Sequence, residues 1–179
     1  MISIVIATEE HLDRIAEIER GAISPAWSSE ALLDEMGRGD SFFIVAVEEA
    51  SIGAPRASHP TTTPWVSHPA TAKVGQKKAE EPFPCLGFAV FRRVGGDGEL
   101  LQIAVDESAR RKGVGDTLMS AVLDYALTND CTSVFLEVRS GNTAAIGLYE
   151  KHDFSTVRVR KDYYDCPVED ALVMSRTLV

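Results

Sequence analysis

Hydrophobic and polar positions along the chain follow two different periods, and together they predict strands and helices. Short apolar runs are typical of buried strands, whereas apolar residues three or four positions apart indicate an amphipathic helix. The apolar runs predict strands at residues 1–7, 41–48, 86–94, 100–105, 133–139, 154–160 and 171–178. The helical spacing predicts helices at residues 8–20, 28–36, 116–127 and 142–151.

Residues at the helix ends support this assignment. Thr8, Ser28 or Ser29, and Asn142 precede three of the predicted helices, and their side chains can accept a hydrogen bond from a free helical N–H group. Gly37 is typical of a residue that ends a helix, here the second one.

The connections between strands predict a mixed sheet. Gly95-Gly96-Asp97-Gly98 is a strong turn signal, which favours antiparallel pairing of the strands on either side. A helix between the strands at 100–105 and 133–139 is the crossover that neighbouring parallel strands need. We therefore expect an α/β (mixed α+β) fold with a central, mostly antiparallel twisted sheet of about seven strands flanked by about four helices.

Residues 51–84 interrupt this pattern. The segment is rich in Pro, Ser, Thr, Ala and Lys and has no sustained periodicity. We expect one domain over residues 1–179 with a flexible or loosely packed insertion at about 51–84. His59 and His68 each precede a proline there, but two histidines without carboxylate or thiol companions make a weak metal site. No metal is expected.

Composition and charge narrow the class of protein. A chain of 179 residues with 45% hydrophobic content is suited to one domain with a substantial core. The formal net charge of −9 argues against general nucleic-acid binding and is compatible with a basic partner, although many soluble proteins are acidic.

The chain also carries features of a cytoplasmic protein. Its three cysteines are widely spaced, so they suggest neither a disulfide framework nor a zinc site. Residues 1–7 lack a basic leader, and no apolar run has membrane-spanning length. We expect a reduced, cytoplasmic environment and no membrane.

The segment at residues 110–115 has the chemistry of a phosphate-binding turn. Gly113 and Gly115 have no Cβ, so the backbone can approach a ligand closely. The first N–H groups of the following helix lack internal partners and, with the helix dipole, favour a pyrophosphate. Arg110, Arg111 and Lys112 add positive charge. The segment lacks the endings typical of P-loops and of dinucleotide-binding turns.

With its neighbours included, this segment resembles the GCN5-related N-acetyltransferase superfamily. The superfamily pattern Gln/Arg-x-x-Gly-x-Gly/Ala is matched by Arg110-x-x-Gly113-x-Gly115. Within the superfamily, the chain is most similar to the RimI-type enzymes, and the resemblance covers nearly the whole chain except the insertion. The segments that carry it are 27–28 (Trp-Ser), 136–139 (Leu-Glu-Val-Arg), 142–146 (Asn-Thr-Ala-Ala-Ile), 148–150 (Leu-Tyr-Glu), 160–164 and 169–171.

The resemblance implies direct acetyl transfer from acetyl-CoA to a protein N-terminal α-amine, with the N-terminal alanine of a small-subunit ribosomal protein as acceptor. It implies Glu137 as the base, Tyr149 as the acid that protonates the departing sulfur, and Tyr163 and Tyr164 as acceptor contacts. The implied cofactor-binding residues are Ile103, Ala104, Val105, Arg110, Arg111, Lys112, Gly113, Val114, Gly115, Asp116 and Asn142.

Each of these residues also has a structural interpretation. Glu137 can be a strand acid facing solvent with a cross-strand Arg or Lys partner, and Tyr149 can pack its ring on the sheet. Asn142 can serve only as a helix cap, and the paired tyrosines can be core anchors. We favour the base for Glu137 because it is the only acid between residues 133 and 139.

The acceptor and the activity have alternatives. An α-amine, with a reference pKa of about 7.7–8.0, needs less help to lose its proton than a lysine at about 10.4, so one carboxylate is sufficient for it. The alternatives are another peptide, a lysine or a small amine as acceptor, or a non-catalytic acetyl-CoA-binding module.

Two positions depart from the RimI-type pattern. Asp116 occupies a position that is usually basic, and we expect it to point to solvent. Asp153 replaces a glycine at a helix exit, where Asp tolerates a positive φ better than most residues.

Overall fold

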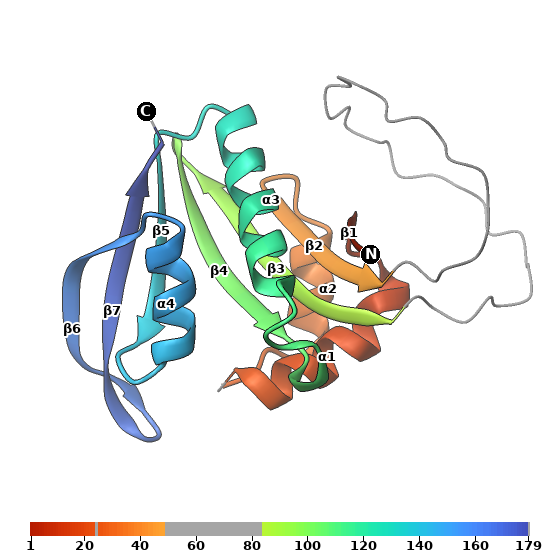
Figure 1. Ribbon diagram of the computed structural model, residues 1–179, viewed down its shortest axis with the longest axis horizontal. Coiled ribbons are helices and arrows are strands. Elements are labelled where there is room, and N and C mark those ends of the chain that lie inside the picture. The colour runs from red at the N-terminus through yellow and green to blue at the C-terminus, as the bar shows by residue number, and fades with distance from the viewer. Residues whose placement is uncertain (24, 49–83, 179) are drawn as a thin grey trace, which may run out of the picture.

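The structure, a computed structural model, describes residues 1–23, 25–48 and 84–178. These residues form one seven-stranded sheet in the order β1-β2-β3-β4-β5-β7-β6 (Figure 1). The strands are β1 (Ile2–Ile6), β2 (Ser41–Glu48), β3 (Cys85–Val94), β4 (Asp97–Val105), β5 (Ser133–Arg139), β6 (Ser155–Asp165) and β7 (Val168–Thr177). The helices are α1 (Leu12–Ala22), α2 (Ser29–Met36), α3 (Val114–Thr128) and α4 (Thr143–Lys151), with short 3-10 turns η1 (Glu9–His11) and η2 (Glu107–Ala109).

The sheet is mixed, as predicted. Its neighbouring strands pair antiparallel except β4 and β5, which are parallel and connected through α3. Residues 51–83 of the predicted insertion, with His59 and His68, lie outside the described residues.

Two hydrophobic cores lie on opposite faces of the sheet because successive strand residues point to opposite faces. Phe42 and Ile44 of β2 join the core under α3 and α4, whereas Phe43 and Val45 join the core under α1 and α2. Both faces of the central strands are therefore covered. This explains why β2 is a nearly continuous apolar run.

Local signals at the helix ends are confirmed. The Ser28 hydroxyl accepts a hydrogen bond from the Ala31 N–H group at 3.1 Å, and the Asn142 side chain accepts one from Ala145 at 3.2 Å. Gly37 is the C-cap of α2. Asp153 has a φ of 61°, as predicted for the exit of α4.

Some boundaries differ from the predicted ones. Thr8 precedes the 3-10 turn η1, so the first α-helix begins later than predicted, at Leu12. The strand predicted at 154–160 extends to Asp165, so Tyr163 and Tyr164 lie inside β6 instead of before a strand. β6 is an edge strand and almost wholly exposed, which is why its polar second half has no apolar period.

The close approach of β3 and β4 makes Gly87 a sensitive position. A Cβ there would lie 2.6 Å from the carbonyl oxygen of Ala104 and 3.3 Å from a methyl group of Leu118. We expect Gly87→Ala to lower the free energy of unfolding by about 1–3 kcal/mol, because backbone must move to accept the methyl group. Urea unfolding measures this loss.

Gly21→Ala is the matched control for this prediction. A Cβ at Gly21 in α1 meets nothing within 4 Å, and alanine is the better helix former, so this variant should be as stable as the parent or more so. Equal urea midpoints for Gly87→Ala and the parent would contradict the packing argument.

Candidate active site

The strands β4 and β5 pair over a short stretch and then separate. Their parallel register covers Gly98–Leu100 of β4 against Val134–Leu136 of β5, and no residue of β5 pairs with β4 beyond Leu100 (Figure 1). Leu100 and Gln102 of β4 pair with Phe91 and Val90 of β3. Leu101, between them, is therefore the extra residue of a bulge in β4. A bulge bends the strand that carries it, and here it lies where the two strands part.

A cavity of about 410 Å³ opens at this separation and extends to both faces of the sheet. Of the predicted site residues, it brings together Ile103, Glu137, Asn142, Tyr149, Tyr163 and Tyr164. The other lining residues include Ala22, Ile23, Pro25, Trp27, Glu99, Leu100, Leu101, Gln102, Val138, Arg139 and Ala145. Ala104, Val105 and the loop at 110–116 are not among the lining residues.

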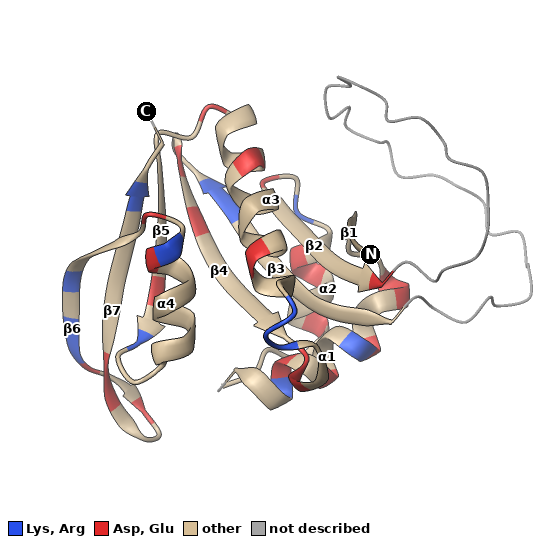
Figure 2. Ribbon diagram, in the orientation of Figure 1, with Lys and Arg blue, Asp and Glu red and all other residues tan. Residues whose placement is uncertain are grey.

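The predicted phosphate-binding loop leads directly into α3. Gly113 is the N-cap with a φ of 84°, and a Cβ placed there would meet nothing within 4 Å. Arg110, Arg111 and Lys112 are exposed, and Figure 2 shows the Lys and Arg colour on the segment that enters α3. The first N–H groups of α3 have no partner within the helix, so the loop presents donors and positive charge together.

The second glycine of the pattern has a different environment. A Cβ on Gly115 would lie 3.3 Å from a methyl group of Leu148 in α4 and 3.8 Å from Val105. Gly115 therefore lets α3 pack closely against α4 and β4. Of the two glycines for which we predicted a close approach to a ligand, only Gly113 has open space beside it.

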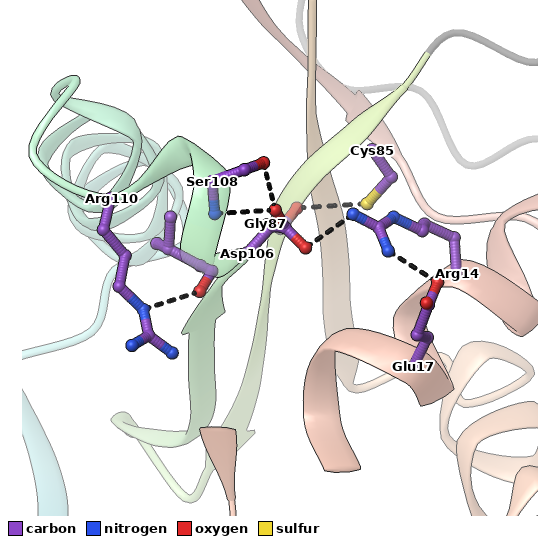
Figure 3. Close-up of polar contacts among 8 residues, drawn as sticks. Arg14, Glu17, Cys85, Gly87, Asp106, Ser108 and Arg110 are labelled. Atoms are coloured by element: carbon purple, nitrogen blue, oxygen red, sulfur yellow. Dashed lines mark hydrogen bonds and ion pairs between the residues drawn. The ribbon is translucent and has the colours of Figure 1, made fainter. Parts of the chain in front are cut away.

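A hydrogen-bonded cluster anchors the start of this loop (Figure 3). The Asp106 carboxylate accepts hydrogen bonds from the Ser108 N–H group at 3.0 Å and from Arg14 of α1 at 2.5 Å. Ser108 first, and then Arg14, hold the pKa of Asp106 below its usual value. The Arg110 Nε donates to the carbonyl of Val105 at 3.3 Å. The loop is thus fixed to both α1 and β4.

Two of the three cysteines are buried. Cys85 is buried, its thiol donates to the Gly87 carbonyl at 3.5 Å, and burial raises its pKa to about 11 (Figure 3). Cys131 is also buried, and its pKa is raised for the same reason. Cys166 is exposed.

Glu137 lies in the cavity and is also half of an ion pair. Its Oε1 accepts a hydrogen bond from Nη1 of Arg160, which reaches it from β6 across β7. The same guanidinium stacks on Tyr163 with its central carbon 4.2 Å from the ring centroid. The carboxylate raises the pKa of the Tyr163 hydroxyl by hydrogen bonding and by its charge. The cross-strand pairing predicted for Glu137 is therefore found, and the same carboxylate lines the cavity.

Tyr149 is the most buried polar group on the α4 side of the cavity. It is 6% exposed, and its ring lies 6.1 Å from that of Phe154. Burial first, and then the nearby Tyr164, raise the pKa of Tyr149 well above its ordinary value of 10.0. Its hydroxyl therefore keeps its proton throughout the neutral range.

Tyr164 lies beside a second ion pair. The Arg139 guanidinium lies 4.0 Å from the Tyr164 ring centroid and donates to Glu169 at 3.2 Å. Glu169 in turn accepts a hydrogen bond from the Gly141 N–H group at 2.5 Å, just before α4. These contacts connect β5, β6, β7 and the start of α4 around the cavity. Asn142, in the same region, both caps α4 and lines the cavity.

A buried pair that the sequence did not reveal positions the opposite wall. The Glu19 carboxylate of α1 accepts hydrogen bonds from the Trp27 N–H group and from the Gln102 side chain, both at 2.8 Å. Trp27 and Gln102 both line the cavity. In the sequence, the only signal for this wall was the Trp27-Ser28 pair. The only signal for Arg160 was that it belongs to the segment 160–164, which carries the family resemblance.

We expected Asp116 to point into solvent, but the structure shows it in contact with two side chains of the α4 end. Its carboxylate accepts from Lys151 at 2.6 Å and lies 3.3 Å from the His152 ring, so it connects α3 with the end of α4. Lys151 first, and then His152, hold the pKa of Asp116 below its usual value. Its negative charge is therefore partly offset beside the loop that enters α3.

Among the described residues, no group of three or more His, Cys, Asp or Glu side chains could hold a metal ion. None of the helices in this part of the chain is long and apolar enough to span a membrane.

The sheet, the separated strands and the loop before α3 define a known class of protein. The model of the acetyltransferase (GNAT) family matches residues 12–154, and the chain belongs to that family. The [ribosomal protein bS18]-alanine N-acetyltransferase of Salmonella typhimurium is 37% identical over 90 residues, which cover 49% of this chain and 61% of that relative. The matched region thus spans less than two thirds of the relative's length.

Solved structures confirm the fold. The ribosomal-protein-S18-alanine N-acetyltransferase from Escherichia coli is similar with a TM-score of 0.74 and 22% identity, over 99% of this chain and 94% of that one. Arabidopsis thaliana NAA60, in a complex with acetyl-CoA, is similar with a TM-score of 0.73 and 18% identity, over 99% of both chains.

Proposed function

We propose that this chain is an acetyl-CoA-dependent N-acetyltransferase that modifies a protein N-terminal α-amine, with the N-terminal alanine of a small-subunit ribosomal protein as its acceptor. One observation carries the proposal. A cavity between the separated strands β4 and β5 holds a carboxylate, Glu137, and a proton-bearing phenol, Tyr149. The relative from Salmonella typhimurium, named for this acceptor, supports the choice of substrate.

The residues present suit a coenzyme A thioester. Arg110, Arg111, Lys112 and the N–H groups around Gly113 would hold its diphosphate, since they combine exposed positive charge with unpaired donors. The edge of β4 that faces β5 is not covered by another described strand beyond Leu100, and it would pair with the amide groups of the extended arm. When bound, acetyl-CoA supplies an acetyl group on sulfur, whose C–S bond breaks as the acetyl carbon bonds to the acceptor nitrogen.

Two side chains would move the protons of this transfer. Glu137 takes the proton that the acceptor nitrogen loses, and Tyr149 gives its hydroxyl proton to the departing sulfur. A proton returned from Glu137 to Tyr149 through solvent restores both groups, so the reaction is balanced. Backbone N–H groups of Ile103, Ala104 and Val105 are the candidates for donation to the thioester oxygen.

The acceptor side of the cavity suits a peptide end. Tyr163, Tyr164 and Trp27 provide aromatic walls, and Glu99 adds an exposed acid at the same opening. An acidic surface attracts a basic protein such as a ribosomal one. A ribosomal acceptor also places the chain in the cytoplasm.

Competing acceptors can be separated by one assay. We expect acetyl transfer to a lysine-free peptide with an N-terminal alanine and little transfer to an N-blocked peptide of similar length that contains lysine. Mass spectrometry locates the added acetyl group. Preferential modification of the blocked peptide would favour a lysine acetyltransferase, and binding of acetyl-CoA without transfer to any amine would favour a non-catalytic module.

A further inference from the structure

The Glu137 carboxylate does not stand alone in the cavity. Arg160 donates a hydrogen bond to it and stacks on Tyr163, which lines the same cavity. Arg160 comes from β6, and Glu137 lies two strands away on β5, with β7 between them. Arg160 therefore reaches over a strand and brings a positive charge to the proposed base.

A carboxylate beside the acceptor amine has two opposing effects, and an arginine paired with the carboxylate can reduce the unfavourable one. The α-amine arrives largely as an ammonium ion near neutral pH, and a lone carboxylate stabilises that charged form. The more strongly Glu137 binds the ammonium ion, the less readily nitrogen becomes the neutral nucleophile. A guanidinium paired with Glu137 reduces this stabilisation, because it offsets the negative charge.

We propose that Arg160 is a positioning residue that orients Glu137 and offsets its charge, so that the acceptor amine binds beside Glu137 without being retained as an ammonium ion. This inference rests on the proposed function. It concerns the handling of the acceptor and is separate from the binding of acetyl-CoA, because Arg160 lies on β6, away from the loop that enters α3.

The other charged and titratable groups around Glu137 do not duplicate this role. Arg139 of β5 is engaged with Glu169 of β7 and with the Tyr164 ring. Glu99 of β4 adds negative charge, and Tyr149 and Tyr163 both have a raised pKa and are neutral at pH 7. Of these groups, Arg160 is the cation that contacts the Glu137 carboxylate directly.

Arg160→Gln tests the inference, with Arg160→Lys as the conservative variant. Arg158→Gln is the matched control, since Arg158 is an exposed arginine on the same strand, and no ion pair is found for it among the described residues. We expect Arg160→Gln to lower kcat for the alanine peptide about tenfold, with an unchanged or lower KM. The pH at which kcat is half-maximal should rise by about one unit, because the ammonium form persists to higher pH. Arg160→Lys should recover most of both effects.

A binding measurement checks the same claim without turnover. Calorimetry at pH 6 with the CoA-saturated protein should show about threefold tighter binding of the alanine peptide to Arg160→Gln than to the parent. Affinity for acetyl-CoA and the thermal midpoint should not change.

The outcomes separate this inference from the proposed function. An active parent whose Arg160→Gln variant keeps the same pH profile would overturn the role of Arg160 alone, whatever its kcat. An equal shift of the pH profile in Arg158→Gln would also overturn it, since the loss of any surface arginine on β6 would then produce the effect. A parent chain that transfers acetyl to no α-amine would overturn both.

Discussion

Glu137→Gln is expected to lower kcat by about 10²- to 10⁴-fold, the usual contribution of a positioned general base. The amide has nearly the shape of the carboxylate but cannot take a proton at neutral pH. Because Glu137 lies on β5, away from the loop that enters α3, the affinity for acetyl-CoA should not change. Steady-state kinetics with the alanine peptide and calorimetry with acetyl-CoA measure the two quantities.

Glu150→Gln provides the control for this substitution. Glu150 is an exposed acid on α4 and does not line the cavity, so the same chemical change there should leave kcat within about twofold of the parent. Full turnover by folded Glu137→Gln across the pH range would remove the assigned base.

Tyr149→Phe is expected to lower kcat by about 10²-fold with a small change in KM, because the phenol would no longer be present to protonate the leaving sulfur. The ring keeps its place beside Phe154, so the fold should be preserved. A raised pKa means that the hydroxyl loses its proton only well above pH 10. Between pH 7 and pH 10.0, the ordinary pKa of a tyrosine, the activity of the parent should therefore not decline through ionisation of Tyr149.

Tyr125→Phe is the matched control for the loss of a hydroxyl group. Tyr125 lies on α3, stacks on Phe42 with ring centroids 3.9 Å apart, and does not line the cavity. Its substitution should leave kcat unchanged. Normal turnover by Tyr149→Phe, or an equal loss in Tyr125→Phe, would reject Tyr149 as the acid.

Much of the fold could be predicted because its signals are local. The continuous apolar run of β2 reflects burial on both faces, and the caps at Ser28 and Asn142 act within three residues. The parallel pairing of β4 and β5 followed from the helix between them. The positive φ of Asp153 followed from its place at a helix exit.

The features that could not be predicted from the sequence depend on contacts between segments that are distant along the chain. The separation of β4 and β5 beyond Leu100 follows no pattern in either strand alone. The second half of β6 is exposed apart from the half-buried Tyr164, so no alternation of apolar and polar residues marks it in the sequence. The Arg160–Glu137 pair required the strand order β5-β7-β6, and the Glu19–Gln102 bond joins residues 83 positions apart. Sequence patterns identify the candidate side chains, but the strand order determines which of them contact one another.

The location of the donor thioester is the centre of this account, and a crystal structure of the chain with acetyl-CoA tests it most directly. We predict the diphosphate on the N–H groups around Gly113 and the acetyl group between β4 and β5, with Glu137 and Tyr149 on opposite sides of it. Acetyl-CoA bound elsewhere on the molecule, or with its acetyl group pointing away from Glu137, would contradict the account.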